Sequence, residues 1–235
     1  MFAWAMKRKV ILLFDVDGTL LSTGGAGRRA MARAFAEICG VGDALDGIRL
    51  GGMTDRLILR TGLERVGRPF EEPIFARIVG VYLDLLRVEV ERSEGYRVLP
   101  GVRELLQRLT GVNGLALGLG TGNVRSGARI KLARAELHRV FDFGGFGCDA
   151  EDRAELLGLG AARGAAQLGI SADEARIVVI GDTPKDILAA RAIGAECVAV
   201  ATGSHSVDEL REAGAERVLE SLEAPEAFAR IAHGE

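Results

Sequence analysis

The sequence of 235 residues has little cysteine: Cys39, Cys148 and Cys197 are widely spaced and odd in number. They fit neither a disulfide framework nor the CxxC spacing of a zinc site, so they indicate a reducing compartment. The sequence also lacks an apolar run of the ~18 residues that a membrane helix needs. Residues 1–6 are too short for the apolar region of a signal peptide. We therefore expect a cytoplasmic protein that has no membrane partner.

An excess of positive charge is missing too, because 30 Lys and Arg residues stand against 33 Asp and Glu residues, for a net charge of −3. A nucleic-acid partner is therefore not expected, since nucleic acids bind to basic surfaces. The composition, 48% hydrophobic and 27% charged, is typical of a globular protein with a sizeable core. The length allows one large domain or one domain with an insert.

Short apolar runs bounded by loop residues predict buried strands. The clearest runs are residues 10–14, 115–120 and 176–181, and weaker ones are 141–146, 196–200 and 217–219. Amphipathic stretches predict helices, the first opening with Pro100, at residues 100–110, 124–135, 154–168, 184–193 and 206–213. This alternation from residue 98 onward predicts an α/β fold, with a Rossmann-like parallel sheet and helices on both faces.

Residues 24–92 interrupt the alternation, because they contain no convincing strand but three helical stretches, at 25–38, 54–66 and 71–92. We interpret residues 22–96 as a small helical cap domain inserted into a core domain of residues 1–21 and 97–235. An insert at this point can cover the carboxyl ends of the strands, where ligands bind in open α/β sheets.

Asp15 and Asp17 follow the first predicted strand directly, in the run Asp-Val-Asp-Gly-Thr-Leu. If the chain stays extended there, side chains at i and i+2 share a side, so both carboxylates face one space. Two close carboxylates repel each other unless a cation or a shared proton relieves the repulsion. The pattern indicates a cation or proton-transfer site, and an Asx-type turn at the strand end is the alternative.

Thr121, Gly122 and Asn123 lie between the strand at 115–120 and the next helix. Small residues let backbone N–H groups approach an anion, and Thr121 adds a hydroxyl. A dinucleotide-binding motif is the alternative, but it needs a third glycine where Asn123 stands. It also needs an acid at the end of the next strand, whereas Asp142 lies near that strand's start.

Asp182 ends the strand at 176–181, and Asp186 lies in the first turn of a helix that Pro184 opens. The alternative role of Asp186 is to complement the helix dipole. With Asp15 and Asp17, these acids are expected at one edge of the parallel sheet. Hard oxygen ligands of this kind suit Mg²⁺ and do not suit zinc, which favours thiolate or imidazole.

These motifs resemble those of the haloacid dehalogenase superfamily of phosphotransferases. The family's first motif, hhhhDxDGTL, matches residues 11–20, its second, a Ser or Thr after a strand, matches Thr121, and its fourth, GDxxxD, matches Asp182 and Asp186. Order and spacing agree over essentially the whole chain, and residues 24–92 resemble the family's small α-helical cap.

The resemblance implies roles for the four acids. Asp15 is expected to be the nucleophile that forms an aspartyl phosphate, and Asp17 to protonate the leaving oxygen and then deprotonate water. Asp15, the backbone carbonyl of Asp17, and Asp182 are expected to hold Mg²⁺. Asp186 is expected to support that site without binding the metal itself.

The phosphoryl oxygens are expected, by the same resemblance, to bind the Thr121 hydroxyl and the backbone N–H groups of Gly122 and Asn123. Asp17 favours phosphoryl transfer over dehalogenation, because a halide leaving group needs no second acid. We therefore expect hydrolysis of a small phosphorylated metabolite, as in phosphoglycolate-phosphatase-like members. A β-phosphoglucomutase-like phosphotransferase is the alternative. A receiver-like signalling domain is a further one, against which Asp17 and the cap argue.

The third motif departs from the family, in which it is usually a lysine. The only lysine between the second and fourth motifs is Lys131, about seven residues into a helix and therefore ~10 Å from its start. We expect it to lie away from the phosphate. Arg153 stands in the expected place and can bind phosphate with its forked guanidinium. Its alternative is a solvated residue at a helix start, and Arg125 is its competitor.

The turn at residues 51–56 joins two helices of the predicted cap. Thr54 is suited to cap the second of them, with Asp55 in its first turn. The functional alternative is that this turn reaches into the site and that Asp55 or Arg56 contacts the substrate's leaving group.

Overall fold

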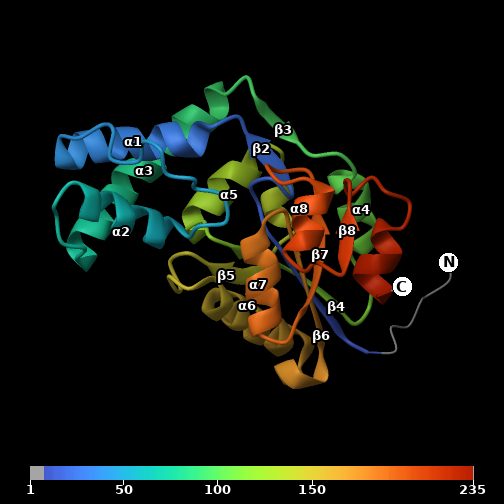
Figure 1. Ribbon diagram of the computed structural model, residues 1–235. Helices are drawn as coiled ribbons and strands as arrows, with labels where there is room; N and C mark the ends of the chain where they lie inside the picture. Colours follow the sequence, from blue (N-terminus) through green and yellow to red (C-terminus); the bar gives the residue numbers. More distant parts are fainter. Residues whose placement is uncertain (1–7, 235) are drawn as a thin grey trace.

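The computed structural model describes residues 8–234 and shows an α/β fold, in which a six-stranded sheet adjoins a group of helices (Figure 1). Neighbouring strands of this sheet are parallel, in the order β5-β4-β1-β6-β7-β8. They are β1 (Val10–Phe14), β4 (Leu115–Thr121), β5 (Phe143–Phe146), β6 (Arg176–Gly181), β7 (Glu196–Val200) and β8 (Arg217–Leu219). The predicted fold class is confirmed, whereas the expectation for residues 1–6 lies outside the described residues.

Helices cover both faces of the sheet because its central strand is apolar on both sides. Leu12 and Phe14 of β1 pack in one cluster with α4 (Val102–Leu109) and α5 (Arg125–Ala133). Ile11 and Leu13 pack on the other face with α6 (Arg153–Leu168) and α7 (Pro184–Ala192). The remaining core elements are α8 (Val207–Glu212) and the short turns η1 (Leu137–Arg139), η2 (Ala172–Glu174) and η3 (Ala229–His233).

The start of α4 differs from the prediction. Gly101 precedes the helix with a φ of 77°, in the left-handed region that favours glycine. A β-carbon at Gly101 would lie 2.4 Å from the carbonyl oxygen of Leu222. Pro100 therefore lies in the turn before the helix and does not open it.

The inserted helices form a second apolar cluster of their own. They are α1 (Ala26–Cys39), α2 (Asp55–Arg65) and α3 (Glu72–Arg92), which lie together at the left of Figure 1. Phe35, Leu59 and Ile78 are buried between them. The cluster gives these helices a reason to pack together, as their amphipathic sequences predict. The domain boundaries at residues 21/22 and 96/97 remain a prediction.

A two-stranded antiparallel ribbon, absent from the sequence prediction, connects the inserted helices to the sheet region. It pairs β2 (Leu21–Thr23) with β3 (Tyr96–Val98), so that Leu21 faces Val98. Each strand has only three residues, which is too short for a periodic pattern. The predicted boundaries fall inside this ribbon.

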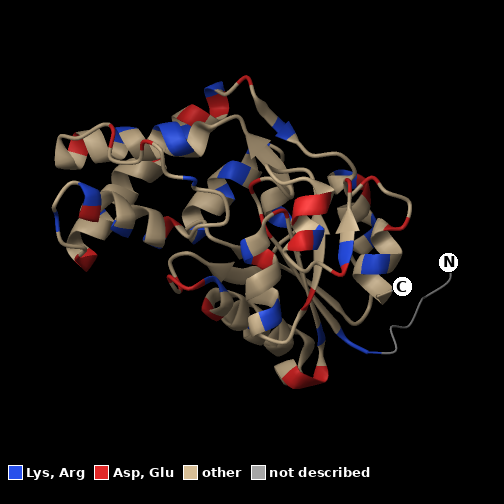
Figure 2. Ribbon diagram, in the orientation of Figure 1, with Lys and Arg blue, Asp and Glu red and all other residues tan. Residues whose placement is uncertain are grey.

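Side chains of both charge signs are interspersed over the fold (Figure 2). Among residues 8–234, none of the helices combines the length and apolarity needed to span a bilayer.

Candidate active site

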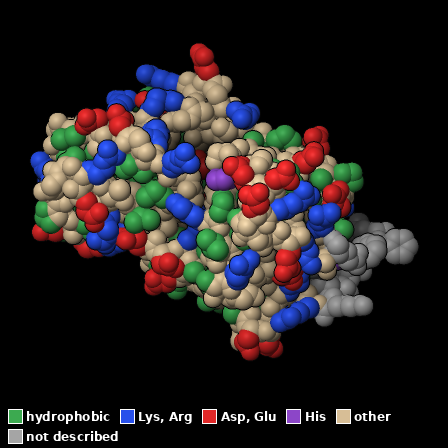
Figure 3. Space-filling model, in the orientation of Figure 1, with side chains coloured by type: hydrophobic (Ala, Val, Ile, Leu, Met, Phe, Trp, Pro, Cys, Tyr) green, Lys and Arg blue, Asp and Glu red, His purple; other side chains and the backbone are tan. Residues whose placement is uncertain are grey.

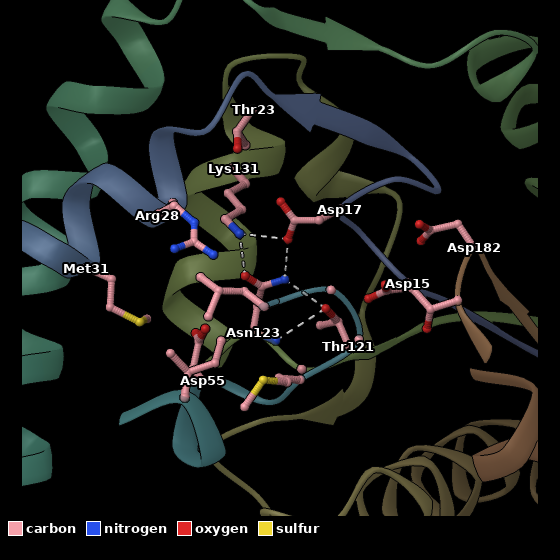
Figure 4. Close-up of a pocket in the computed structure, with 18 of the residues that line it drawn as sticks. Asp15, Asp17, Thr23, Arg28, Met31, Asp55, Thr121, Asn123, Lys131 and Asp182 are labelled. Carbon is pink, nitrogen blue, oxygen red and sulfur yellow. Dashed lines mark hydrogen bonds and ion pairs between the residues drawn. The ribbon is translucent and has the colours of Figure 1, made fainter. Parts of the chain in front are cut away.

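A cavity of about 240 Å³ lies where the carboxyl ends of β1, β4 and β6 face the inserted helices, and Figure 3 shows a hollow between the two regions. The sheet side contributes the predicted site residues Asp15, Asp17, Thr121, Gly122, Asn123, Arg153 and Asp182. Figure 4 shows the side chains of Asp15, Asp17, Thr121, Asn123 and Asp182 converging from separate segments of the chain. These residues therefore lie together at one edge of the sheet, and the roles assigned to them stay a prediction.

Asp15 is held at the end of β1 by a backbone hydrogen bond from its N–H to the carbonyl of Ile180, at 2.9 Å. Burial raises the pKa of its carboxyl to about 6, while the Arg153 guanidinium lowers it and the nearby acids raise it further. Arg153 Nη2 lies 3.3 Å from Asp15 Oδ1. The nucleophile candidate is thus a buried acid next to one cation.

Asp186 is fully buried behind Asp15, and its carboxylate is already bound by protein donors. Arg153 Nε donates to its Oδ1 at 2.8 Å, and the Thr183 hydroxyl donates to its Oδ2 at 2.6 Å. Thr183 in turn caps α7, since its side chain accepts from the Asp186 N–H. This arrangement fits a residue that fixes Arg153 and the loop after β6.

Asp182 has fewer partners. Within residues 8–234, the one hydrogen bond to its carboxylate comes from the Thr19 hydroxyl, at 3.2 Å. Burial, followed by the charge of Asp15, raises its pKa to about 8. Gly18, with a φ of 84°, lies so close to this carboxylate that a β-carbon there would be 2.4 Å from an Asp182 oxygen. Removing the glycine would displace Asp182.

The donor set fits a divalent metal ion. Asp15, Asp182 and Asp186 each place one carboxylate oxygen so that the three lie within 4.8 Å of one another, and all three residues are buried. Three buried acids grouped around Arg153 form a site of excess negative charge, which Mg²⁺ would relieve. Asp15 and Asp182 have the free oxygens to hold such an ion.

Asp17 and Asp182 lie on two sides of Asp15 (Figure 4), and the Asp17 side chain is partly exposed to the cavity. Its Oδ2 accepts hydrogen bonds from Asn123 Nδ2 at 2.8 Å and from Lys131 Nζ at 2.7 Å. Asn123 Nδ2 also donates to the Thr121 hydroxyl at 2.8 Å. Figure 4 shows this network of dashed contacts along one wall of the cavity.

Lys131 lines the cavity, so the expectation that it lies away from the site is wrong. That expectation considered only the ~10 Å of helical rise between the start of the helix and the Lys131 backbone. Lys131 is two turns after Val124 on the same face of α5, and helical side chains point back toward the helix N-terminus. The long aliphatic part of the lysine side chain therefore spans the distance from the helix backbone to the cavity.

The turn before α2 caps that helix and also reaches the cavity, while its contact with the substrate's leaving group stays a prediction. Thr54 caps α2 by accepting from the Leu57 N–H at 3.2 Å, and its hydroxyl donates to the Glu151 carbonyl at 2.9 Å. The neighbouring Asp55 is buried and lines the cavity. Capping and contact with the site therefore occur together.

Two candidate arginines lie elsewhere. Arg56 pairs with Glu72 and covers the rings of Phe70 and Phe75, and Arg125 lies over Phe146 at 4.3 Å. Neither lines the cavity. The inserted helices contribute instead Arg28, Met31 and Tyr82, which nothing in the local sequence pattern singles out.

Comparison with known proteins identifies the family to which the chain belongs. The family model described as haloacid dehalogenase-like hydrolase matches residues 10–194, and the chain belongs to this family. A curated relative, "Probable phosphatase IndB" from Dickeya dadantii (strain 3937), is 28% identical over 219 residues, which cover 91% of this chain and 90% of the relative.

Solved structures show the same fold. A hydrolase from Pseudomonas syringae is 24% identical with a TM-score of 0.63, covering 97% of this chain and 98% of its own. A predicted phosphoglycolate phosphatase from Haemophilus somnus 129PT is 18% identical with a TM-score of 0.62, covering 92% and 95%. CbbY from Rhodobacter sphaeroides, solved in complex with phosphate, is 23% identical with a TM-score of 0.63, covering 92% and 96%.

Proposed function

We propose that this hydrolase is a Mg²⁺-dependent phosphatase that cleaves a small organic phosphate monoester through an aspartyl phosphate on Asp15. The observation that carries the proposal is the meeting of Asp15, Asp17 and Arg153 in one small cavity beside the acidic pair of Asp15 and Asp182. Family membership and the relative named as a probable phosphatase support it. The cavity of about 240 Å³ suits a small substrate.

In the first half of the reaction, an Asp15 carboxylate oxygen attacks phosphorus in line with the leaving oxygen. Asp17 donates a proton to that oxygen, so the product leaves as a neutral alcohol. In the second half, Asp17 takes a proton from water, whose oxygen attacks the phosphorus of the aspartyl phosphate. Inorganic phosphate leaves, and Asp15 and Asp17 return to their starting states.

Positive charge and hydrogen-bond donors orient the phosphoryl group. The Thr121 hydroxyl, the N–H groups of Gly122 and Asn123, and Arg153, which Asp186 anchors, would bind its oxygens. Asp15, the carbonyl of Asp17, and Asp182 would hold Mg²⁺. When bound, the ion offsets the repulsion between an anionic phosphate and an anionic nucleophile.

Release of inorganic phosphate tests this function. The protein, incubated with Mg²⁺ and p-nitrophenyl phosphate or a panel of phosphorylated metabolites, should release phosphate steadily and should stop when a chelator is added. A phosphomutase would return the phosphoryl group to a sugar and require a bisphosphate activator. A receiver-like domain would become phosphorylated without turnover.

Two variants identify the proposed acids. Asp15→Asn should abolish turnover because it removes the nucleophile. Asp17→Asn should keep its backbone carbonyl but lose proton transfer, which contributes roughly 10²–10⁴-fold. Wild-type turnover by Asp15→Asn would contradict the mechanism.

A further inference from the structure

Lys131 occupies an unusual position for a lysine. It lies in the last turns of α5, and its side chain is only 6% exposed. Lysine is almost never this buried unless it is paired. Its ammonium group passes below Gly27 of α1, where an added β-carbon would lie 3.3 Å from Nζ. The absence of a side chain at Gly27 gives the ammonium room to reach the cavity wall.

The ammonium group completes a three-membered hydrogen-bonded ring with Asp17 and Asn123. Lys131 Nζ donates to Asp17 Oδ2 at 2.7 Å and to Asn123 Oδ1 at 2.6 Å. Asn123 Nδ2 donates to the same Asp17 Oδ2 at 2.8 Å. Each contact therefore fixes the orientation of the other two groups (Figure 4).

Both donors of this ring go to one oxygen of Asp17. Its other oxygen, Oδ1, receives no hydrogen bond from the residues that the structure describes. A carboxyl group that transfers a proton needs one oxygen free to meet the reacting atom. The ring holds Oδ2 and leaves Oδ1 available.

We propose that Lys131 is a positioning residue that holds Asp17 by Oδ2 so that Oδ1 transfers the proton. The inference rests on the proposed function, because it needs Asp17 to be the acid and base. In the first half-reaction the proton moves from Oδ1 to the leaving oxygen as the bond from phosphorus to that oxygen breaks. The carboxylate that results has the Lys131 ammonium beside it. In the second half, Oδ1 takes the proton from the attacking water.

A purely structural lysine and a phosphate-binding lysine make different predictions. A structural lysine would affect all substrates alike through folding. A phosphate-binding lysine would also affect all phosphate esters alike, because the phosphoryl group is common to them. A lysine that positions the proton donor matters most when the leaving group is poor, since only then does departure depend on protonation.

The test compares wild type with Lys131→Met on phenyl phosphate and on p-nitrophenyl phosphate, whose leaving group departs more readily without a proton. We expect kcat/KM for phenyl phosphate to fall by ~10²-fold, the scale of general acid catalysis. The loss for p-nitrophenyl phosphate should be at least several-fold smaller. Lys131→Gln, which keeps a hydrogen-bond donor on a side chain one bond shorter, should recover part of the loss and serves if Lys131→Met does not fold.

The matched control is Arg129→Met, which removes a cation from the exposed side of the same helix, outside the cavity. It should retain wild-type rates on both substrates. In the Asp17→Asn background, Lys131→Met should cause little further loss, because the two residues act as one unit.

Equal losses on both phosphate esters, or a full additional loss in the double variant, would overturn the positioning role. These results differ from failure of the proposed function. In that case wild type itself shows no Mg²⁺-dependent phosphate release, and the role assigned to Lys131 falls with it.

Discussion

Asp55 and Val124 join the inserted helices to the sheet region: the Val124 N–H donates to Asp55 Oδ2 at 2.8 Å. A second bond runs in the other direction, from the Asp55 N–H to the carbonyl of Gly122 at 2.7 Å. Asp55 thus satisfies a backbone donor at the start of α5 that the helix leaves unpaired. These two bonds hold the first residue of α2 in register with residues 121–124, which link β4 to α5.

This contact predicts a pH-dependent stability. Burial raises the pKa of Asp55 to about 6, while Lys131 and the Val124 hydrogen bond lower it and Asp17 raises it. The folded protein therefore keeps a proton on Asp55 that the unfolded chain, with a pKa near 3.8, loses. The contribution of Asp55 is full below pH 4 and is lost as pH rises to about 6.

Asp55→Asn keeps an acceptor for Val124 and removes this titration. Between pH 4 and pH 6, the free energy of unfolding of wild type should fall relative to Asp55→Asn, by up to about 3 kcal/mol. Urea unfolding of both proteins at several pH values measures the difference. A constant difference across this range would contradict the buried, protonated state of Asp55. The buried Tyr82 does not contribute to this pH dependence. Burial raises its pKa well above the usual value, so its side chain stays neutral throughout the range.

Arg153→Ala should lower kcat/KM by ~10²–10³-fold, the scale of losing one preorganised donor to developing charge. It should also lower the melting temperature, because Asp15 and Asp186 lose their buried cation. Arg153→Lys should recover part of the activity, since a point charge returns without the fork. Arg125→Ala is the matched control and should have a smaller effect. Normal turnover by Arg153→Ala together with loss in Arg125→Ala would reassign the phosphate cation to Arg125.

Gly27→Ala should separate stability from activity. Alanine is at least as favourable as glycine at a helical position, so the melting temperature should not fall. The new β-carbon crowds the Lys131 ammonium, and we expect kcat to drop about tenfold, equivalent to ~1.4 kcal/mol in the barrier. The control is Gly80→Ala in the interior of α3, where an added β-carbon meets nothing within 4 Å; it should raise the melting temperature and leave activity unchanged. Unchanged kcat in Gly27→Ala would argue against the positioning of Asp17 through Lys131.

We expect Mg²⁺ alone to stabilise the protein, because the proposed metal site exists in the folded protein and not in the unfolded chain. At 100 times its dissociation constant the gain is about 2.7 kcal/mol, measurable as a rise in melting temperature. Asp182→Asn should lose most of this rise, while Asp142→Asn, an exposed acid outside the cavity, should keep it. A full rise in Asp182→Asn would place the ion elsewhere.

The sequence predicted those parts of the site that depend on the ends of strands. Asp15, Thr121 and Asp182 each follow an apolar run, and parallel strands bring such positions together. Lys131 was missed because helical rise counts the backbone and not the reach of the side chain. Arg28 and Tyr82 were missed because the local pattern of a helix does not say which face meets a distant sheet.

The ribbon of β2 and β3 has a consequence for how this chain can be varied. Leu21 and Val98 are paired, so the polypeptide departs for the inserted helices and comes back at one place. The segment between Leu21 and Val98 is therefore attached to the rest of the chain at two adjacent points. It contributes no strand to the six-stranded sheet. Replacing the segment between Leu21 and Val98 with that of a relative would exchange the side of the cavity formed by the inserted helices. The side formed by the sheet, with Asp15 and Asp182, would stay unchanged. We expect such a replacement to change the range of substrates that the protein accepts.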